Sequence, residues 1–291
     1  MISQSSELAL ITGASSGIGR AIAERLAAQG RHVVLVARNR NKLEGFARHL
    51  TATYGVRATA IACDLAEPDG VDQLIAELVI EQHKPTMLIN CAAVGATGAF
   101  WDSSHAALSR MLLLNTDAIV QITRHVLPHM LAINHGSILN VSSMVSAFPV
   151  PFMACYGATK AFVSSFTQAL RQELRGSDIV VTELSPGVVL TEFQQAAGYT
   201  LTDAERNAAM TADQIAESAL RALARRRAVQ VPGLLNAIAA FALTLVPKRF
   251  VAWCTARFMR KTGRAKLQAA SRIDVLRIRE ARHKDIAQMS E

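Results

Sequence analysis

Short apolar runs alternate with longer segments of helical periodicity along most of this chain, and this alternation restricts the folds open to it. The apolar runs predict seven strands, at residues 8–11, 32–37, 57–62, 87–89, 137–141, 179–184 and 229–231. Helical patterns lie between them, at residues 17–29, 41–54, 69–83, 115–133, 156–175 and 211–226. Strands separated by helices form a parallel sheet that is covered on both faces. We therefore predict a doubly wound α/β fold with a seven-stranded parallel sheet flanked by helices.

The chain of 291 residues is long enough to bury one large core, and 51% of its residues are hydrophobic. No internal repeat or low-complexity linker interrupts the first 230 or so residues. We predict one domain over residues 1–232. Residues 233–291 are predicted to form a helical, basic extension that packs on this domain, on a partner subunit or on a membrane surface.

The formal net charge of +8 lies at the C-terminal end of the chain. Residues 248–291 contain twelve Lys and Arg against four Asp and Glu, so the rest of the chain is neutral overall. A generally basic body of the kind that binds nucleic acid is therefore excluded, and we predict no nucleic-acid partner.

The N-terminal residues and the cysteines bear on the cellular compartment. Residues 1–7 are polar and lack the basic start and long apolar stretch of a secretory signal. The four cysteines lie far apart, with no pair at metal-ligand or C-x-x-C spacing. We therefore expect free thiols, no metal and a cytoplasmic location, with membrane association left open for the C-terminal extension.

A glycine-rich segment, TGASSGIG at residues 12–19, joins the first predicted strand to the first predicted helix. Glycines at such a turn permit positive φ angles and let the backbone approach a pyrophosphate. The helix that follows adds free N–H groups and the positive end of its dipole. Because the segment lies between a strand and a helix, it predicts a dinucleotide site. The residues assigned to this site are Gly13, Ser15, Ser16, Gly17, Ile18 and Gly19.

The end of the second predicted strand indicates which dinucleotide is preferred. Enzymes that use NAD generally place a carboxylate there, on the ribose 2′-hydroxyl. This chain instead has Arg38, and no acidic residue occurs between Gln29 and Glu44. A guanidinium suits a 2′-phosphate in charge and in the planar arrangement of its donors. We predict NADP(H) rather than NAD(H), with Arg38 as the principal contact.

Three further segments complete a recognisable set. Ser142-Ser143 follows the fifth strand, YGATK at residues 156–160 opens the next helix, and PGVVLT at residues 186–191 follows the sixth strand. In order and spacing, these segments and the glycine loop resemble the classical short-chain dehydrogenases/reductases (SDR family), over roughly residues 7–232. The resemblance implies a Rossmann-type fold and an oxidoreductase that transfers a hydride between nicotinamide and a carbonyl or secondary alcohol.

The tyrosine and lysine of this set are suited to acid–base chemistry. Tyr156 and Lys160 are four residues apart and share one face of the predicted helix. A nearby ammonium lowers the pKa of a phenol from its ordinary value of about 10. By resemblance, Tyr156 is the general acid in reduction and the base in oxidation, and Lys160 also holds the nicotinamide ribose. Ser143 orients the substrate oxygen, and Asn115 matches the asparagine that supports a proton-relay water.

Other positions match cofactor contacts of the family. The segment LINCAA at residues 88–93 keeps Asn90, but Cys91 and Ala93 depart from the usual N-N-A-G pattern. By resemblance, Asp64 and Leu65 contact the adenine ring. The segment 186–191 binds the nicotinamide carboxamide through Pro186, Gly187, Val189 and Thr191. Asn90 is also assigned to the cofactor site.

The sequence gives fewer signals for the residues that bind the substrate than for those that bind the cofactor. Residues 192–210 lack strong strand or core signals, and by resemblance they form a mobile lid. Residues 148–153 (FPVPFM) offer apolar side chains either to a pocket or to the core. We expect a hydrophobic ketone or alcohol. Some family members with a similar extension act on long-chain 3-oxoacyl or steroid-like ketones, so a lipid-like carbonyl is the expected substrate.

The extension admits two interpretations. Residues 234–246 are apolar and uncharged, but they are fewer than the roughly 20 residues that span a bilayer. Apolar, aromatic and basic residues are then interleaved over residues 249–264, a pattern typical of an amphipathic helix on an anionic membrane. The same pattern fits a helix packed on the domain or on a partner subunit. Residues 271–291 are expected to form a charged helix or a loose tail.

A protein that keeps this fold and binds the cofactor without turnover is the alternative to an enzyme. Such proteins typically lose the tyrosine or the lysine, whereas this chain has Asn115, Ser143, Tyr156 and Lys160. We therefore predict an enzyme. By resemblance, we expect a homodimer or homotetramer formed through the helices at residues 115–133 and 156–175.

Overall fold

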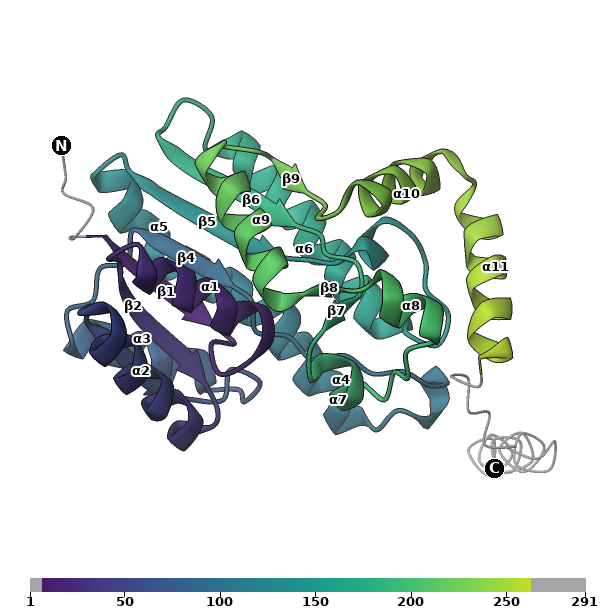
Figure 1. Cartoon of the computed structure of the whole chain (residues 1–291), viewed down its shortest axis with the longest axis horizontal. Helices are drawn as coiled ribbons and strands as arrows, with labels where there is room; N and C mark the ends of the chain where they lie inside the picture. Colours follow the sequence, from purple (N-terminus) through teal and green to yellow (C-terminus); the bar gives the residue numbers. More distant parts are fainter. Residues whose placement is uncertain (1–6, 263–291) are drawn as a thin grey trace, which may run out of the picture.

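A computed structural model describes residues 7–262 of the chain and contains one large parallel sheet (Figure 1). Its strands, in chain order, are β1 (Leu8–Thr12), β2 (His32–Ala37), β3 (Ala58–Ala62), β4 (Met87–Asn90), β5 (Gly136–Val141), β6 (Ile179–Leu184) and β9 (Val229–Gln230). Their order across the sheet is β3-β2-β1-β4-β5-β6-β9. The chain therefore runs outward from β1 to β3 and then returns to place β4 on the other side of β1. This confirms the predicted doubly wound, Rossmann-type fold.

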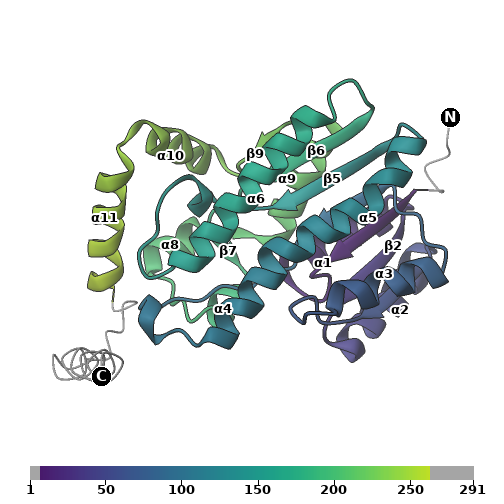
Figure 2. The same ribbon diagram turned by 180° about the vertical axis from the view of Figure 1, so that it is seen from behind.

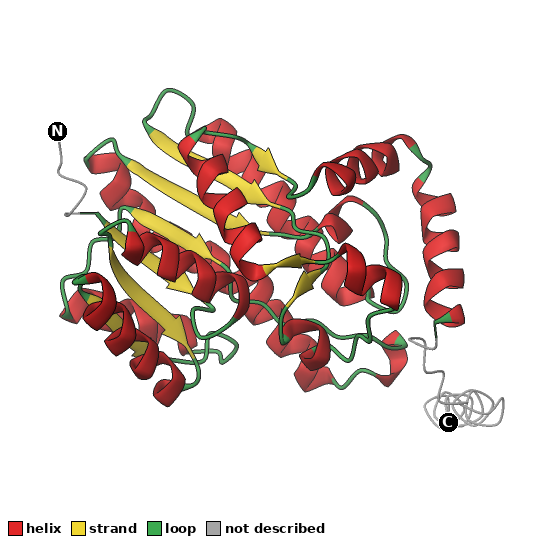
Figure 3. Ribbon diagram, viewed as in Figure 1, coloured by secondary structure: helices red, strands yellow, loops and turns green. Residues whose placement is uncertain are grey.

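Helices cover both faces of the sheet, as Figures 2 and 3 show. One face carries α1 (Gly17–Ala28), α2 (Arg40–Tyr54) and α9 (Ala212–Ala224), and the other carries α3 (Gly70–Ile80), α5 (Ala118–Ala132) and α6 (Ala154–Glu173). The strands supply apolar side chains to both faces because successive residues point in opposite directions. In β1, Ala9 and Ile11 pack on the first face, whereas Leu8 and Leu10 pack on the second.

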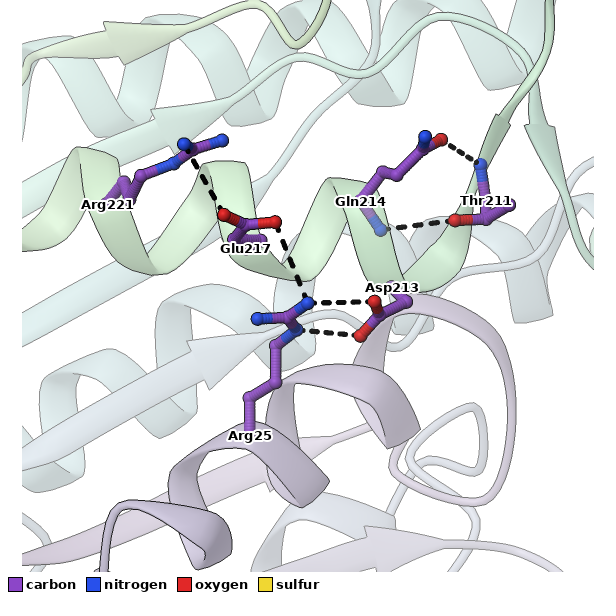
Figure 4. A network of polar contacts seen from close by, with 6 residues as sticks. All are labelled: Arg25, Thr211, Asp213, Gln214, Glu217 and Arg221. Atoms are coloured by element: carbon purple, nitrogen blue, oxygen red, sulfur yellow. Dashed lines mark hydrogen bonds and ion pairs between the residues drawn. The ribbon is translucent and has the colours of Figure 1, made fainter.

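A surface ion pair joins α1 to α9 (Figure 4). Nε and Nη2 of Arg25 donate to the carboxylate of Asp213 at 2.7 and 2.8 Å, and Glu217 lies 3.7 Å from Nη2. Thr211 and Gln214 form a capping box at the start of α9. These contacts fix α9 against α1 at the point where the chain returns to the sheet from the predicted lid.

The helix predicted at residues 115–133 begins earlier than expected. α4 (His105–Leu112) runs into a π-helical segment, Leu113–Asp117, and then into α5. Ser104 caps α4, and its side chain accepts a hydrogen bond from the backbone N–H of Ala107 at 3.2 Å. The π-helical turn contains Asn115, whose side chain is buried.

The predicted lid contains more regular structure than its sequence indicates. β7 (Val189–Leu190) and β8 (Met210–Thr211) pair in a small parallel sheet. Two short helices, α7 (Phe193–Ala196) and α8 (Asp203–Ala208), lie between these strands.

Outside the lid, two turns of 3₁₀ helix precede α6 in the chain, at Phe100–Asp102 and Met144–Ala147.

The C-terminal extension begins with two helices, α10 (Leu234–Leu245) and α11 (Lys248–Lys261). Figures 1 and 2 both place them at the end of the molecule that lies far from α2, and α10 stands out from the body beyond β9. Within residues 7–262, no helix is long and apolar enough to cross a membrane. The prediction for residues 271–291 concerns residues outside the described part of the chain.

Candidate active site

A cavity of about 920 Å³ follows the carboxyl ends of the strands. β1 and β4 are neighbours in the sheet, but their connections run to opposite sides, and ligands of α/β proteins bind at such a point. Most of the predicted site residues line this cavity. They are Gly13, Ser15, Ser16, Gly17, Ile18, Arg38, Asp64, Leu65, Ser143, Tyr156, Lys160, Pro186, Gly187, Val189 and Thr191. The structure places Gly19, Asn90 and Asn115 behind its wall.

The glycine loop forms a close-fitting turn beside β4. Gly13 has a φ of +69°, and a Cβ atom there would lie 2.9 Å from backbone atoms of Ala92. A Cβ atom at Gly19 would lie only 2.5 Å from the carbonyl oxygen of Gly13. α1 begins at Gly17, and the N–H groups of its first turn have no carbonyl partner within the helix. This turn fits a dinucleotide pyrophosphate, because backbone donors can approach it without side chains in between.

The junction between β1 and β4 accommodates the departures at Cys91 and Ala93. Oγ1 of Thr12 accepts hydrogen bonds from the backbone N–H groups of Cys91 and Ala92, at 3.0 and 3.1 Å. All residues of β4 are buried. The strand ends at Asn90, so both departures lie in the segment that follows it.

Basic side chains gather where β2 ends. The Arg38 side chain is 65% exposed, and its Nη1 atom lies 4.0 Å from Oδ2 of Asp64. Two residues that we did not predict, Asn39 and Lys42, also line the cavity here. Oδ1 of Asn39 accepts a hydrogen bond from the backbone N–H of Lys42 at 3.0 Å and caps α2. The sequence signal that could have identified these two residues is Asn39 itself, because asparagine is a typical capping residue at the start of a helix.

Asp64 is held in place from two sides. Its carboxylate accepts hydrogen bonds from Nη2 of Arg110 at 2.6 Å and from the backbone N–H of Ala66 at 3.0 Å. Burial alone would raise the pKa of this carboxyl group, but the hydrogen bonds from Ala66 and Arg110 outweigh burial and lower it. Asp64 is therefore a fixed anion beside Arg38.

Ser143, Tyr156 and Lys160 come together in the middle of the cavity wall. Ser143 follows β5, while Tyr156 and Lys160 lie on the first turns of α6. Nζ of Lys160 donates a hydrogen bond of 2.8 Å to the carbonyl oxygen of Val141. The Tyr156 ring packs against Phe193 of α7, with 5.6 Å between the ring centroids. The predicted lid therefore touches the tyrosine directly.

Burial is the main cause of the pKa shifts of Tyr156 and Lys160. It raises the pKa of Tyr156 to about 12, although a hydrogen bond with Ser143 acts in the opposite direction. It lowers the pKa of Lys160 to about 8. We expected Lys160 to lower the phenol pKa, and this prediction was wrong for the structure, because burial raises the pKa instead. At neutral pH the phenol carries its proton and can donate it.

Asn115 joins three parts of the site from behind the cavity. Its Oδ1 accepts from the backbone N–H of Val94 at 2.9 Å, and its Nδ2 donates to the Val94 carbonyl oxygen at 2.8 Å and to Oγ1 of Thr159 at 3.1 Å. It therefore holds the loop after β4 against α6. Its role beside a relay water stays a prediction.

Asn90 belongs to a second buried network. Its Nδ2 donates to Oδ1 of Asn140 at 2.8 Å and to Oγ1 of Thr123 at 3.2 Å. This network ties β4 to β5 and α5. The part predicted for Asn90 in cofactor binding stays a prediction.

The other end of the cavity is apolar. Val150 and Met153, from the predicted segment 148–153, are buried in a cluster with Tyr156 and Met259. We did not predict that α11 reaches this cluster. Four of its side chains line the cavity, namely Cys254, Thr255, Phe258 and Met259. The alternation of apolar and basic residues was the available signal, but it does not show what the apolar side packs against.

Comparisons with known proteins agree with this arrangement. Residues 7–201 match the family model described as short chain dehydrogenase. An uncharacterised oxidoreductase of Staphylococcus epidermidis is 30% identical over 225 residues, which cover 77% of this chain and 94% of the relative.

Two solved structures are similar over most of the chain. A short-chain dehydrogenase from Sphingobium yanoikuyae in complex with NADPH has 34% identity and a TM-score of 0.73, covering 91% of this chain and 99% of the other. The bulky-bulky ketone specific alcohol dehydrogenase from Comamonas testosteroni has 30% identity and a TM-score of 0.70, covering 91% and 98%. The chain therefore belongs to the short-chain dehydrogenase family, and it is an oxidoreductase that uses a nicotinamide cofactor.

Proposed function

We propose that the protein is an NADP(H)-dependent carbonyl reductase and alcohol dehydrogenase for a hydrophobic, lipid-like substrate, such as a 3-oxoacyl or steroid-like ketone. One observation carries this proposal: Ser143, Tyr156 and Lys160 meet in a cavity that has Arg38 and Lys42 at one end and is apolar at the other. The polar end suits the cofactor, and the apolar end suits the substrate.

The chain's own residues supply the proton chemistry. Bound NADPH supplies the hydride that the carbonyl carbon receives. The Tyr156 hydroxyl donates its proton to the carbonyl oxygen, and the Ser143 hydroxyl donates a hydrogen bond to the same oxygen. Lys160 places a positive charge beside the phenol and favours the phenolate that remains. In alcohol oxidation the same groups act in reverse.

Preference for the 2′-phosphate rests on Arg38, Asn39 and Lys42. Arg38 and Lys42 bring two cationic side chains to the cavity where β2 ends, and Asn39 caps α2 between them. Each cation lies at the outer limit of an ion pair, Arg38 with Asp64 at 4.0 Å and Lys42 with Glu192 at 3.9 Å, so both can turn to a phosphate. A phosphate is bound well by such donors, whereas a ribose hydroxyl gains little from them. The NADPH bound to the Sphingobium relative supports this preference.

The size and lining of the substrate end support a bulky apolar carbonyl. Val150, Met153 and Met259 are buried there, and Phe148 and Phe193 also line the cavity. The Comamonas relative is named for bulky-bulky ketones, which fits an enlarged apolar pocket.

We further propose a cytoplasmic homodimer or homotetramer assembled through α5 and α6, with residues 1–232 as its cofactor-binding domain. Leu131 on α5 and Phe162 on α6 are exposed apolar residues on these helices. Light scattering of the purified protein tests the oligomer.

The function is tested by following NADPH consumption with ketones and 3-oxoacyl thioesters of increasing chain length. NADH is run in parallel, and Tyr156→Phe serves as the inactive reference. We expect turnover that improves with chain length and is lost in the variant. Cofactor binding without turnover on any carbonyl would instead favour a regulatory protein that has kept the fold.

A further inference from the structure

α10 presents an uncovered apolar face to solvent. No residue of this helix is buried. Five of its six large apolar side chains are between 56 and 82% exposed: Leu234, Leu235, Ile238, Phe241 and Leu245. Four of them, at positions 234, 238, 241 and 245, recur at helical spacing and form one stripe. An exposed apolar stripe of this kind is typical of a surface that binds a partner or a membrane.

α11, the next helix in the chain, also carries exposed aromatic and basic side chains. Phe250 and Trp253 are exposed and stacked, with 6.0 Å between their ring centroids. Arg260 lies over the Phe152 ring. The other four basic residues of α11 form no ion pair with any residue in the described range 7–262; they are Lys248, Arg249, Arg257 and Lys261.

The charge of this region identifies the kind of partner. Residues 233–262 contain five Lys and Arg and no Asp or Glu. Two copies of this surface would repel each other, because α11 brings no acidic residue to pair with the basic ones. A surface that is both negatively charged and able to take up apolar side chains matches it, and an anionic lipid bilayer has both properties.

We propose that α10 and α11 bind the surface of an anionic lipid bilayer. With twelve residues, α10 is about 18 Å long, shorter than the roughly 30 Å of the hydrocarbon layer. It therefore lies at the interface with its stripe of Leu, Ile and Phe in the acyl region. Lys248 and Arg249, in the first turn of α11, reach the phosphate groups of the lipids.

Both helices also border the cavity. Asn236 of α10 and Cys254, Thr255, Phe258 and Met259 of α11 line the cavity. Membrane binding itself follows from the two helices and does not depend on the reaction. Delivery of an apolar carbonyl from the lipid phase rests on the proposed function.

Co-sedimentation of the full chain with vesicles tests the proposal. Vesicles of phosphatidylcholine with about 30% phosphatidylglycerol are compared with pure phosphatidylcholine. We expect binding to the anionic vesicles that weakens as salt is raised. Phe241→Gln/Leu245→Gln should lower the partition coefficient about 100-fold, and Lys248→Gln/Arg249→Gln roughly 25-fold, since each basic residue contributes roughly fivefold.

A matched control and a fluorescent reporter separate binding from misfolding. Val79→Gln/Ile80→Gln replaces two equally exposed apolar residues on α3 and should leave binding unchanged. Trp101→Phe leaves Trp253 as the sole tryptophan, and its emission should shift to shorter wavelength only when anionic vesicles are added. NADPH turnover on a short, soluble ketone should be the same in Phe241→Gln/Leu245→Gln as in the wild type.

Three results would overturn the proposal. The first is the absence of binding to anionic vesicles, and the second is equal binding to both vesicle types. The third is a wild-type oligomer that Phe241→Gln/Leu245→Gln dissociates in the absence of lipid, because the stripe would then be covered by a second copy of the chain. If the wild type turned over none of the ketones and 3-oxoacyl thioesters, the proposed function would be refuted and the membrane-binding proposal would be unaffected.

Discussion

Nζ of Lys160 lies 5.8 Å from the centroid of the Tyr156 ring, and both side chains are almost completely buried. Burial favours the neutral form of each group, so the pKa of Lys160 falls to about 8 while that of Tyr156 rises to about 12. On a rising pH scale the lysine therefore loses its proton before the tyrosine does. Between these two values the site holds a neutral amine beside a neutral phenol.

This order of titration predicts the pH dependence of carbonyl reduction. Below about pH 8 Lys160 is charged and supports proton donation by Tyr156. As the pH rises through about 8 the charge is lost, so kcat should fall by up to tenfold per pH unit while the phenol is still protonated. Lys160→Arg keeps its charge at higher pH and should move the decline upward. A kcat that stays constant from pH 6 to 10 would contradict this assignment.

Removing the Tyr156 hydroxyl should separate catalysis from binding. Tyr156→Phe keeps the ring, and with it the packing against Phe193. Because only the proton donor is lost, we expect kcat to fall about 10²–10⁴-fold with the NADPH dissociation constant nearly unchanged. Stopped-flow turnover and fluorescence titration measure the two quantities. Tyr54→Phe, at the end of α2, is the matched control and should be fully active.

Arg38 should determine the preference between the two cofactors. We expect Arg38→Ala to weaken NADPH binding about tenfold or more, because a charged hydrogen bond to the 2′-phosphate is lost. NADH binding should be unaffected, since NADH lacks that phosphate. Arg40→Ala is the control, because Arg40 is equally exposed and pairs with Glu44 on the same helix. Equal effects of Arg38→Ala on both cofactors, measured by calorimetry, would show that Arg38 does not contact the phosphate.

Asn115 should contribute to stability as well as to activity. Asn115→Ala leaves the N–H and carbonyl groups of Val94 without their partner. It also removes one hydrogen bond from the Thr159 hydroxyl, which still donates to the carbonyl oxygen of Tyr156. Unpaired buried polar groups are costly, so we expect a loss of roughly 2–4 kcal/mol in the free energy of unfolding. Urea denaturation measures it. Asn41→Ala is the comparison, because Asn41 is exposed in the first turn of α2, and it should cost much less.

The sequence was sufficient for the sheet and for the centre of the site because both depend on local patterns. Continuous apolar runs such as residues 33–36 identify strands buried on both faces, and the Tyr156-to-Lys160 spacing fixes two side chains on one helix face. The start of the long helix was missed although Ser104 is a typical capping residue. The π-helical turn at Asn115 is a local irregularity, and the periodicity of an α-helix does not reveal it.

Features that depend on distant contacts could not be predicted in the same way. β7 and β8 have two residues each and pair across the whole lid, so neither gives a periodic signal. Met259 is buried in one cluster with Tyr156, although Tyr156 lies more than 100 positions earlier in the chain. Nothing in the pattern of residues 249–264 indicates which surface Met259 packs against. Burial also reversed the expected shift of the Tyr156 pKa, because the cost of desolvation depends on the whole fold.

The Arg25–Asp213 pair should make the docking of α9 on α1 sensitive to acid. The hydrogen bond from Arg25 lowers the pKa of Asp213, so the pair stabilises the fold above the ordinary carboxyl range. This contribution is lost as the pH falls through the lowered pKa of Asp213. We therefore expect Asp213→Asn to lower Tm at pH 7, and the difference from the wild type to close as the pH approaches 3. Asp72→Asn is the control, because Asp72 also lies in the first turn of a helix but forms no ion pair within the described part of the chain. If Asp72→Asn lowered Tm as much as Asp213→Asn, the effect would come from the helix dipole and not from Arg25.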